Sequence, residues 1–141
     1  MRIYQFQGRP TDAQNALQEL IVRAPDDANL HLQVAVTFVA QNDLKSAREE
    51  LETSLRLGPG NPDAFDKLGA VLLRMGLTQD ALARFEKCRL IAPDFDHPVI
   101  NAALAYTRTG EPDKARQVLT EFFARHPENA RVREALEKKV R

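Results

Sequence analysis

A small apolar residue followed four positions later by a bulky apolar one recurs at even intervals along this chain. The pairs are Ala13 and Leu17, Ala47 and Leu51, Ala81 and Phe85, and Ala115 and Leu119. Residues four apart share one face of a helix, so each pair predicts a helix that a neighbouring helix can approach closely. A second set has spacing three, in Ala35 and Phe38, Gly69 and Leu72, and Ala103 and Tyr106. The pattern predicts two kinds of helix that alternate, with Gly69 serving close packing rather than flexibility.

The same pattern predicts an all-α chain, because no stretch shows the two-residue alternation of a strand. The predicted helices span residues 11–23, 28–41, 44–57, 62–75, 78–91, 96–109, 112–125 and 129–140. Asp27, Asn61 and Asn129 stand at the starts of three of them, where Asp and Asn are favoured N-caps. In the sixth helix Phe95 occupies the corresponding place, so we expect Asp96 to cap that helix instead.

Prolines and turn residues set the interval between these helices. Pro25, Pro59, Pro93 and Pro127 follow one another at a spacing of 34 residues. Turn residues recur with the same period at Gly8, Asn42, Gly76 and Gly110. Gly and Asn tolerate the left-handed backbone that ends a helix. A fixed period of this length indicates a stack of helix pairs rather than a single globule.

Together these positions resemble the tetratricopeptide repeat, a 34-residue helix pair with small residues at positions 8 and 20, bulky ones at 11 and 24, and proline at 32. The resemblance implies an all-α fold, a right-handed α-solenoid of antiparallel helix pairs. It divides a single domain, residues 1–141, into a partial repeat, three complete repeats and a capping helix, at 1–27, 28–61, 62–95, 96–129 and 130–141. The sequence departs from the family pattern at His31 and Val99 (position 4) and at Phe122 (position 27).

The two ends of the chain differ in character. Tyr4 and Gly8 continue the repeat phase upstream, so we expect the chain to begin part-way through the first helix of an earlier unit. The charged residues around Val132 and Leu136 are typical of a helix that caps a solenoid. A truncated start and a capped end suggest the last repeats of a longer protein or an excised domain, with a natural short protein as the alternative.

Composition narrows the classes of function. The chain has 20 basic and 20 acidic residues, so it lacks the basic excess of a general nucleic-acid binder. No apolar run reaches the ~20 residues that cross a membrane. The first residues lack the apolar stretch of a secretory signal. We therefore expect a cytoplasmic protein that binds neither nucleic acid nor membrane.

No convincing catalytic constellation is present in the sequence. His31, His97 and His126 lie in different units and lack metal-ligand spacing. Cys88 is the single cysteine and stands at a small packing position, which indicates a buried structural thiol. We predict no enzymatic activity, no metal site and no cofactor.

In the family that the sequence resembles, positions 2, 5, 9, 12 and 13 of each first helix point into a concave groove. Carried over, they are Asn29, Leu32, Val36, Val39, Ala40, Asp63, Asp66, Ala70, Leu73, Arg74, His97, Ile100, Leu104, Thr107 and Arg108. The candidate peptide-binding residues chosen from them are Asn29, Leu32, Val36, Val39, Ala70, Leu73, Arg74, Ile100, Leu104 and Arg108. Positions 5 and 9 lack the Lys and Asn with which the family clamps a C-terminal carboxylate, so we exclude that binding mode.

The middle of this wall is apolar, and two interpretations stay open. It is a groove for an amphipathic helix or an extended peptide, or it is core covered by other helices, a missing domain or a second copy. The first interpretation predicts a noncatalytic protein–protein interaction scaffold that binds a peptide or partner domain. The alternative function is an accessory module of a larger enzyme or assembly complex whose active part lies outside this chain. A third hypothesis is self-association through the N-terminal repeat face.

Overall fold

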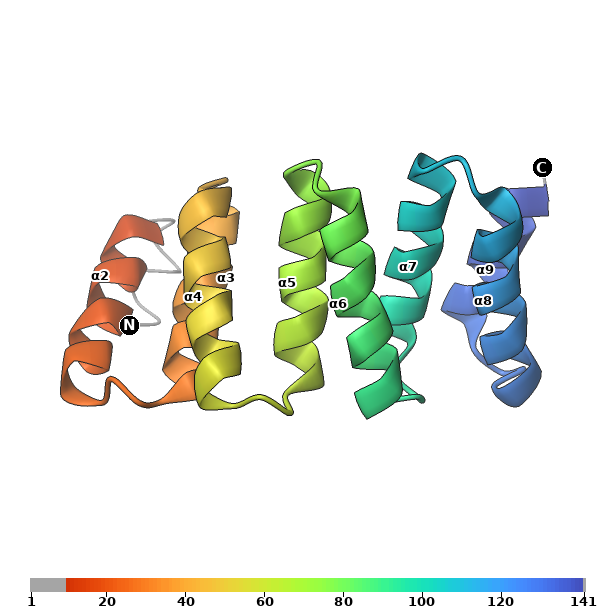
Figure 1. Ribbon diagram of the computed structural model, residues 1–141. Coiled ribbons are helices and arrows are strands. Elements are labelled where there is room, and N and C mark those ends of the chain that lie inside the picture. Colours follow the sequence, from red (N-terminus) through yellow and green to blue (C-terminus); the bar gives the residue numbers. More distant parts are fainter. Residues whose placement is uncertain (1–9, 141) are drawn as a thin grey trace.

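The computed structural model describes residues 10–140, and within them the chain folds into helices joined by short turns (Figure 1). The helices are α2 (Pro10–Arg23), α3 (Ala28–Ala40), α4 (Leu44–Leu57), α5 (Pro62–Arg74), α6 (Thr78–Ile91), α7 (Asp96–Arg108), α8 (Pro112–Arg125) and α9 (Ala130–Val140). Every one of these helix ends lies within one residue of the range predicted from the sequence. The predicted partial helix around Tyr4 and Gly8 lies outside the described residues.

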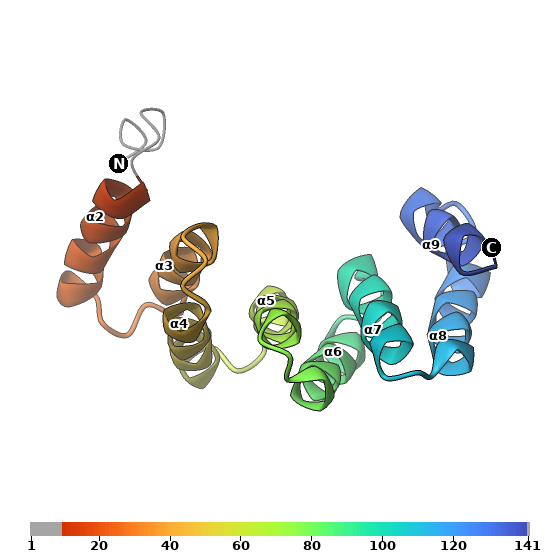
Figure 2. The same ribbon diagram turned by 90° about the horizontal axis from the view of Figure 1, so that it is seen from above.

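Each helix packs against the next one in the chain, so the molecule is a row of antiparallel helices rather than a bundle around one centre. Seen from above in Figure 2, the row is curved. Helices α3, α5, α7 and α9 follow its inner side, and α4, α6 and α8 follow its outer side. This arrangement confirms the prediction of an all-α solenoid built from helix pairs.

The recurring small and bulky residues form the contacts between the helices. Ala47, Leu51, Ala81 and Phe85 are fully buried. A Cβ atom built at Gly69 of α5 would lie 2.4 Å from the ring carbon Cε1 of Phe85 in α6. Since that distance is a clash, the residue at position 69 must be glycine while the Phe85 ring keeps its place. Gly69 therefore serves close packing, as predicted.

Side-chain caps begin the first helices of two units but not of the third. Asp27 and Asn61 each accept backbone N–H hydrogen bonds at the N-cap. The predicted cap at Asp96 is wrong, because α7 begins at Asp96 itself and Phe95 occupies the N-cap without a side-chain bond. Phe95 has the same extended backbone (φ −83°, ψ 118°) as Asn61 (φ −81°, ψ 108°), so packing of the repeat fixes the helix start whatever the side chain. The Asp96 carboxylate instead accepts a bond from Asn129 Nδ2 at 3.2 Å.

In two of the three complete units, the residue at position 27 links the second helix to the start of the first helix. Ser54 Oγ donates to the Ala28 carbonyl at 2.8 Å, and Cys88 Sγ donates to the Pro62 carbonyl at 3.1 Å. Burial is the main cause that raises the pKa of the Cys88 thiol to about 12. Cys88 is thus a buried structural thiol, as predicted, whereas Phe122 at the same position of the next unit has no group to donate.

Candidate functional site

The residues predicted to line a groove lie on α3, α5 and α7, the helices of the inner side (Figure 2). The exposed ones are Asn29, Val36, Arg74, Leu104 and Arg108, and the half-buried ones are Val39, Ala70 and Ile100. Leu32 and Leu73 are buried, with 7% and 6% of their surface exposed. The apolar stripe is therefore partly surface and partly core.

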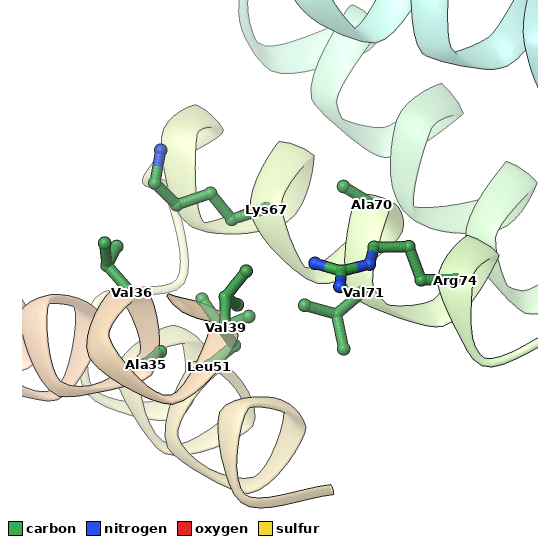
Figure 3. Close-up of a pocket in the computed structure, with 8 residues that line it drawn as sticks. All are labelled: Ala35, Val36, Val39, Leu51, Lys67, Ala70, Val71 and Arg74. Carbon is green, nitrogen blue, oxygen red and sulfur yellow. The ribbon is translucent and has the colours of Figure 1, made fainter. Parts of the chain in front are cut away.

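A hollow opens between α3 and α5 in the apolar part of this wall (Figure 3). Its lining residues are Ala35, Val36, Val39, Leu51, Lys67, Ala70, Val71 and Arg74, and its volume is about 160 Å³. Val36 at the surface is 45% exposed, whereas Leu51 is fully buried. The hollow thus presents apolar surface within reach of solvent, between the first helices of two consecutive units.

Two cations stand beside the apolar residues of this hollow. Figure 3 shows the side chains of Lys67 and Arg74 extending from α5 toward α3. Lys67 Nζ donates to Asp63 Oδ1 on its own helix at 3.0 Å. Arg74 Nη2 donates to Oδ1 of Asn42, in the α3–α4 turn, at 2.8 Å. Asn42 reaches this place with a left-handed backbone, φ 60°, as the turn pattern predicted.

A second hollow, of about 350 Å³, lies between α7 and α9. Its lining residues are Ile100, Ala103, Leu104, Leu119, Arg131, Glu134, Ala135 and Lys138. Leu104 is 39% exposed there. Arg131 Nη1 lies 3.5 Å from Asp96 Oδ1, so this cation already has an acidic partner. The charged lining residues of this hollow are of both signs, unlike those of the first.

Between the two hollows, polar side chains link α5 to α7. Asp66 Oδ1 accepts a hydrogen bond from Asn101 Nδ2 at 3.0 Å, and His97 Nδ1 lies 3.6 Å from Asp66 Oδ2. Asp66 is 5% exposed, and its burial is the main cause that raises the pKa of its carboxyl group. The bond from Asn101 and the nearby His97 oppose that shift. Asp66, which the resemblance placed among the groove residues, is thus a buried link between units.

His31 occupies the aromatic place of its unit and is held by two hydrogen-bond acceptors. Its Nδ1 lies 2.7 Å from Glu50 Oε2, and its Nε2 lies 2.9 Å from the Pro25 carbonyl oxygen. Both partners only accept, and a neutral imidazole has a single N–H, so this geometry fits the protonated ring. Burial lowers the pKa of His31, but the bonds to Glu50 and Pro25 outweigh it, and the pKa is raised.

The sequence did not identify Lys67, Ala35, Leu51 or Val71 as residues around a hollow. Ala35 and Leu51 were recognised only as packing positions, and Lys67 stands next to a groove position rather than in one. One signal was available, since Lys67 and Arg74 are seven residues apart and lie on the same face of α5 two turns apart. The gap between α3 and α5, however, depends on how far the two units separate.

The chemistry of the α3–α5 hollow is that of alkyl surface, ammonium and guanidinium groups, which contact apolar side chains and bind anions. Within residues 10–140, no group of three or more His, Cys, Asp or Glu side chains is placed to hold a metal ion. None of the helices described above is long and apolar enough to cross a lipid bilayer.

Known protein families account for nearly the whole sequence. Tetratricopeptide repeat models match residues 2–62 and residues 72–139. The chain belongs to the tetratricopeptide repeat family. Tetratricopeptide repeat proteins are typically noncatalytic scaffolds that bind protein or peptide partners, and the fold is that of a protein–protein interaction module.

Solved structures of other proteins share this tetratricopeptide repeat fold. A MamA protein is 25% identical, with a TM-score of 0.82 over 92% of this chain and 71% of its own. MamA from Desulfovibrio magneticus RS-1, residues 41 to the end, is 22% identical, with a TM-score of 0.83 over 98% and 78%. YrrB, described as a TPR protein with an unusual peptide-binding site, is 18% identical, with a TM-score of 0.84 over 99% and 71%.

Proposed function

We propose that this tetratricopeptide repeat protein is a noncatalytic scaffold that binds a peptide or partner domain along the concave wall of α3, α5 and α7. The observation that carries the proposal is the apolar hollow between α3 and α5, which is open to solvent. The peptide-binding site described for YrrB supports it, because YrrB has the same fold.

The proposed contacts divide by exposure. Val36 and Leu104 have 45% and 39% of their surface uncovered, so a partner gains about 25 cal/mol for each Å² of this apolar surface that it covers. Asn29, Arg74 and Arg108 are exposed and offer hydrogen-bond donors to a peptide. The other proposed contacts are Leu32, Val39, Ala70, Leu73 and Ile100, which shape the wall from a half-buried or buried position.

The register of the repeat also supports the proposed division into units at 1–27, 28–61, 62–95, 96–129 and 130–141. In this division α3, α5 and α7 are the first helices of the three complete units, so each contributes one part of the proposed groove. The predicted cytoplasmic location and the predicted lack of nucleic-acid binding belong to the same proposal. They rest on composition and charge.

Selection from a phage-displayed library of random linear peptides tests the proposal. The chain is compared with Val36→Glu, which places a carboxylate at the edge of the hollow. We expect the selected peptides to bind Val36→Glu at least about tenfold more weakly, a loss of about 1.4 kcal/mol. Val36 is better suited to this test than Leu73, because a charge at the buried Leu73 would disrupt the core.

Leu90→Glu is the matched control, since Leu90 is an exposed apolar residue (81%) on the outer helix α6. Circular dichroism of both variants checks that the helices persist. Peptides that bind wild type and Val36→Glu equally well, but lose affinity for Leu90→Glu, would place binding on the outer face and refute the proposal.

A further inference from the structure

The chemistry of the α3–α5 hollow narrows the kind of partner. We propose that this hollow receives one apolar side chain of a partner peptide that carries carboxylates on both sides of it, with Arg74 and Lys67 as their contacts. The inference rests on the proposed function and specifies the ligand of that same wall.

The size of the hollow limits it to one anchoring side chain. Sites for drug-sized ligands have volumes of roughly 300–1,000 Å³, whereas this hollow has about 160 Å³. Six of its lining residues carry only alkyl groups, so an apolar side chain is the fitting occupant. They are Ala35, Val36, Val39, Leu51, Ala70 and Val71.

The charged residues that line the hollow have one sign. Lys67 and Arg74 are its two charged lining residues, and none of the residues lining it is acidic. Seven residues of helix separate the two cations by about 10 Å along the axis of α5. An extended peptide rises about 3.3 Å per residue, so carboxylates about three positions apart match both cations, with the apolar side chain between them.

Both cations can take a carboxylate from a partner. Arg74 gives one N–H to the neutral Asn42 side chain, and it keeps its other N–H donors and its full charge. That bond also holds the guanidinium beside the hollow before a ligand arrives, which lowers the entropy cost of binding. Lys67 pairs with Asp63, but both side chains are well exposed, at 39% and 46%, and such pairs contribute little. Arg74 is therefore the principal contact and Lys67 the second.

The α7–α9 hollow shows that this charge pattern is particular to the first one. Glu134 is among its lining residues, and Arg131 faces Asp96 at 3.5 Å. A carboxylate arriving there meets the acidic Glu134 and the already paired Arg131, and Lys138 is the one further cation in the lining. Of the two hollows, we therefore expect only the α3–α5 hollow to prefer a peptide with acidic residues on both sides of the apolar one.

Three fluorescein-labelled peptides test the inference by fluorescence anisotropy. Each has a single leucine between two variable positions that are three residues apart. Both variable positions hold aspartate in the first peptide, asparagine in the second and lysine in the third. We expect the aspartate peptide to bind about tenfold more tightly than the asparagine peptide, as for one charge-assisted contact. The lysine peptide should bind most weakly.

Arg74→Gln should abolish most of the difference between the aspartate and asparagine peptides, and Arg74→Lys should retain part of it. Arg116→Gln is the matched control, because Arg116 is an exposed arginine on the outer helix α8 and lines neither hollow. It should leave the preference unchanged. Circular dichroism confirms the fold of each variant.

Failure of the inference is distinguishable from failure of the proposed function. Equal binding of the aspartate and asparagine peptides, weakened alike by Val36→Glu, refutes the acidic preference and leaves the groove in place. Binding of the aspartate peptide that survives Val36→Glu refutes both. If none of the three peptides binds, the inference is refuted. The library selection then still tests whether the concave wall binds peptides. A dimer in sedimentation that dissociates in Val36→Glu would assign the hollow to a second copy of the chain and refute the inference.

Discussion

The α3–α5 and α5–α7 junctions join equivalent helices through equivalent repeat positions, yet different side chains meet there. At position 5 the first junction has Leu32 and the second has Asp66, and at position 6 of the following helix the residues are Lys67 and Asn101. Asp66 and Asn101 bond to each other at 3.0 Å. Leu32 offers no acceptor, and Lys67 pairs with Asp63 of its own helix instead. At these two positions the α5–α7 junction is therefore linked by polar groups, while the α3–α5 junction has a cation beside an apolar hollow.

The two junctions also differ in their side chains at the opposite end of the helices. Arg74 bonds to Asn42 in the turn of the preceding unit. Arg108 stands at the equivalent position of the next unit, but the corresponding turn residue is Gly76, which has no side chain to accept a bond. A few substitutions on an almost constant backbone thus give two neighbouring junctions different chemistry. The two junctions thus differ at positions where the repeat does not require a particular residue.

The largest expected effect comes from removing the contact that holds α5, the helix common to both junctions, against α6. Phe85→Ala empties the space against Gly69 and separates α5 from α6. We expect a loss of about 3–5 kcal/mol in the free energy of unfolding, measured by urea denaturation. Gly60→Ala is a neutral control, since a Cβ there meets nothing within 4 Å. A loss below about 1 kcal/mol for Phe85→Ala would contradict the packing described here.

The polar link itself is tested by Asn101→Ala. This change leaves the buried Asp66 carboxylate without its hydrogen-bond donor, so we expect a loss of about 1.5–3 kcal/mol. Lys67→Ala changes the equivalent position of the α3–α5 junction and should cost at most about 0.5 kcal/mol, because its ion pair is exposed. Equal losses in the two variants would show that the junctions do not differ energetically.

His31 makes the first unit sensitive to pH in a way that Phe65 and Val99 at the same position cannot be. Its pKa is raised in the folded chain, so its stabilising contribution is fully present below the ordinary histidine pKa of 6.5. That contribution is lost as the pH rises through the raised value. We expect the unfolding free energy to fall by about 1 kcal/mol, roughly one hydrogen bond, as the pH rises from 6.5 through the raised pKa of His31.

His31→Phe is the matched variant for this measurement, since it restores the aromatic residue found in the neighbouring unit. Urea midpoints of wild type and variant are compared across the pH range, and the variant should lack the decline. If the variant shows the same decline in stability as the wild type, the contact of His31 with Glu50 and Pro25 is not the source of that decline.

Cys88→Ser should have the smallest effect. Serine occupies the same position in the first unit, where Ser54 donates to the Ala28 carbonyl, so we expect a change within about 1 kcal/mol. The native thiol, with a pKa of about 12, should react with a disulfide reagent at pH 8 only when urea unfolds the chain. Rapid labelling of the folded protein would show that Cys88 is accessible.

Much of the fold could be predicted from the sequence. The helix ends, the left-handed turns at Asn42, Gly76 and Gly110, and the packing role of Gly69 all follow from local rules repeated every 34 residues. The cap at Asp96 was the exception, because the repeat backbone sets the start of α7 without a side-chain cap.

The candidate site could be predicted only in part. Repeat positions indicated which residues lie on the first helices, and Val36, Val39, Ala70 and Arg74 do line a hollow. The positions did not indicate that Leu73 is buried or that Asp66 is bonded across to Asn101. Exposure depends on the neighbouring unit, which a position within one unit does not contain.

The periodic residues thus determine the order of the helices, their lengths and their close contacts, because each of those features depends on side chains less than one repeat apart. The separation of α3 from α5, the hollow between them and the pairing of Arg74 with Asn42 depend on residues of two different units, brought together when the units stack. Packing between units decides these features, since it determines which polar groups find partners and which apolar groups stay uncovered.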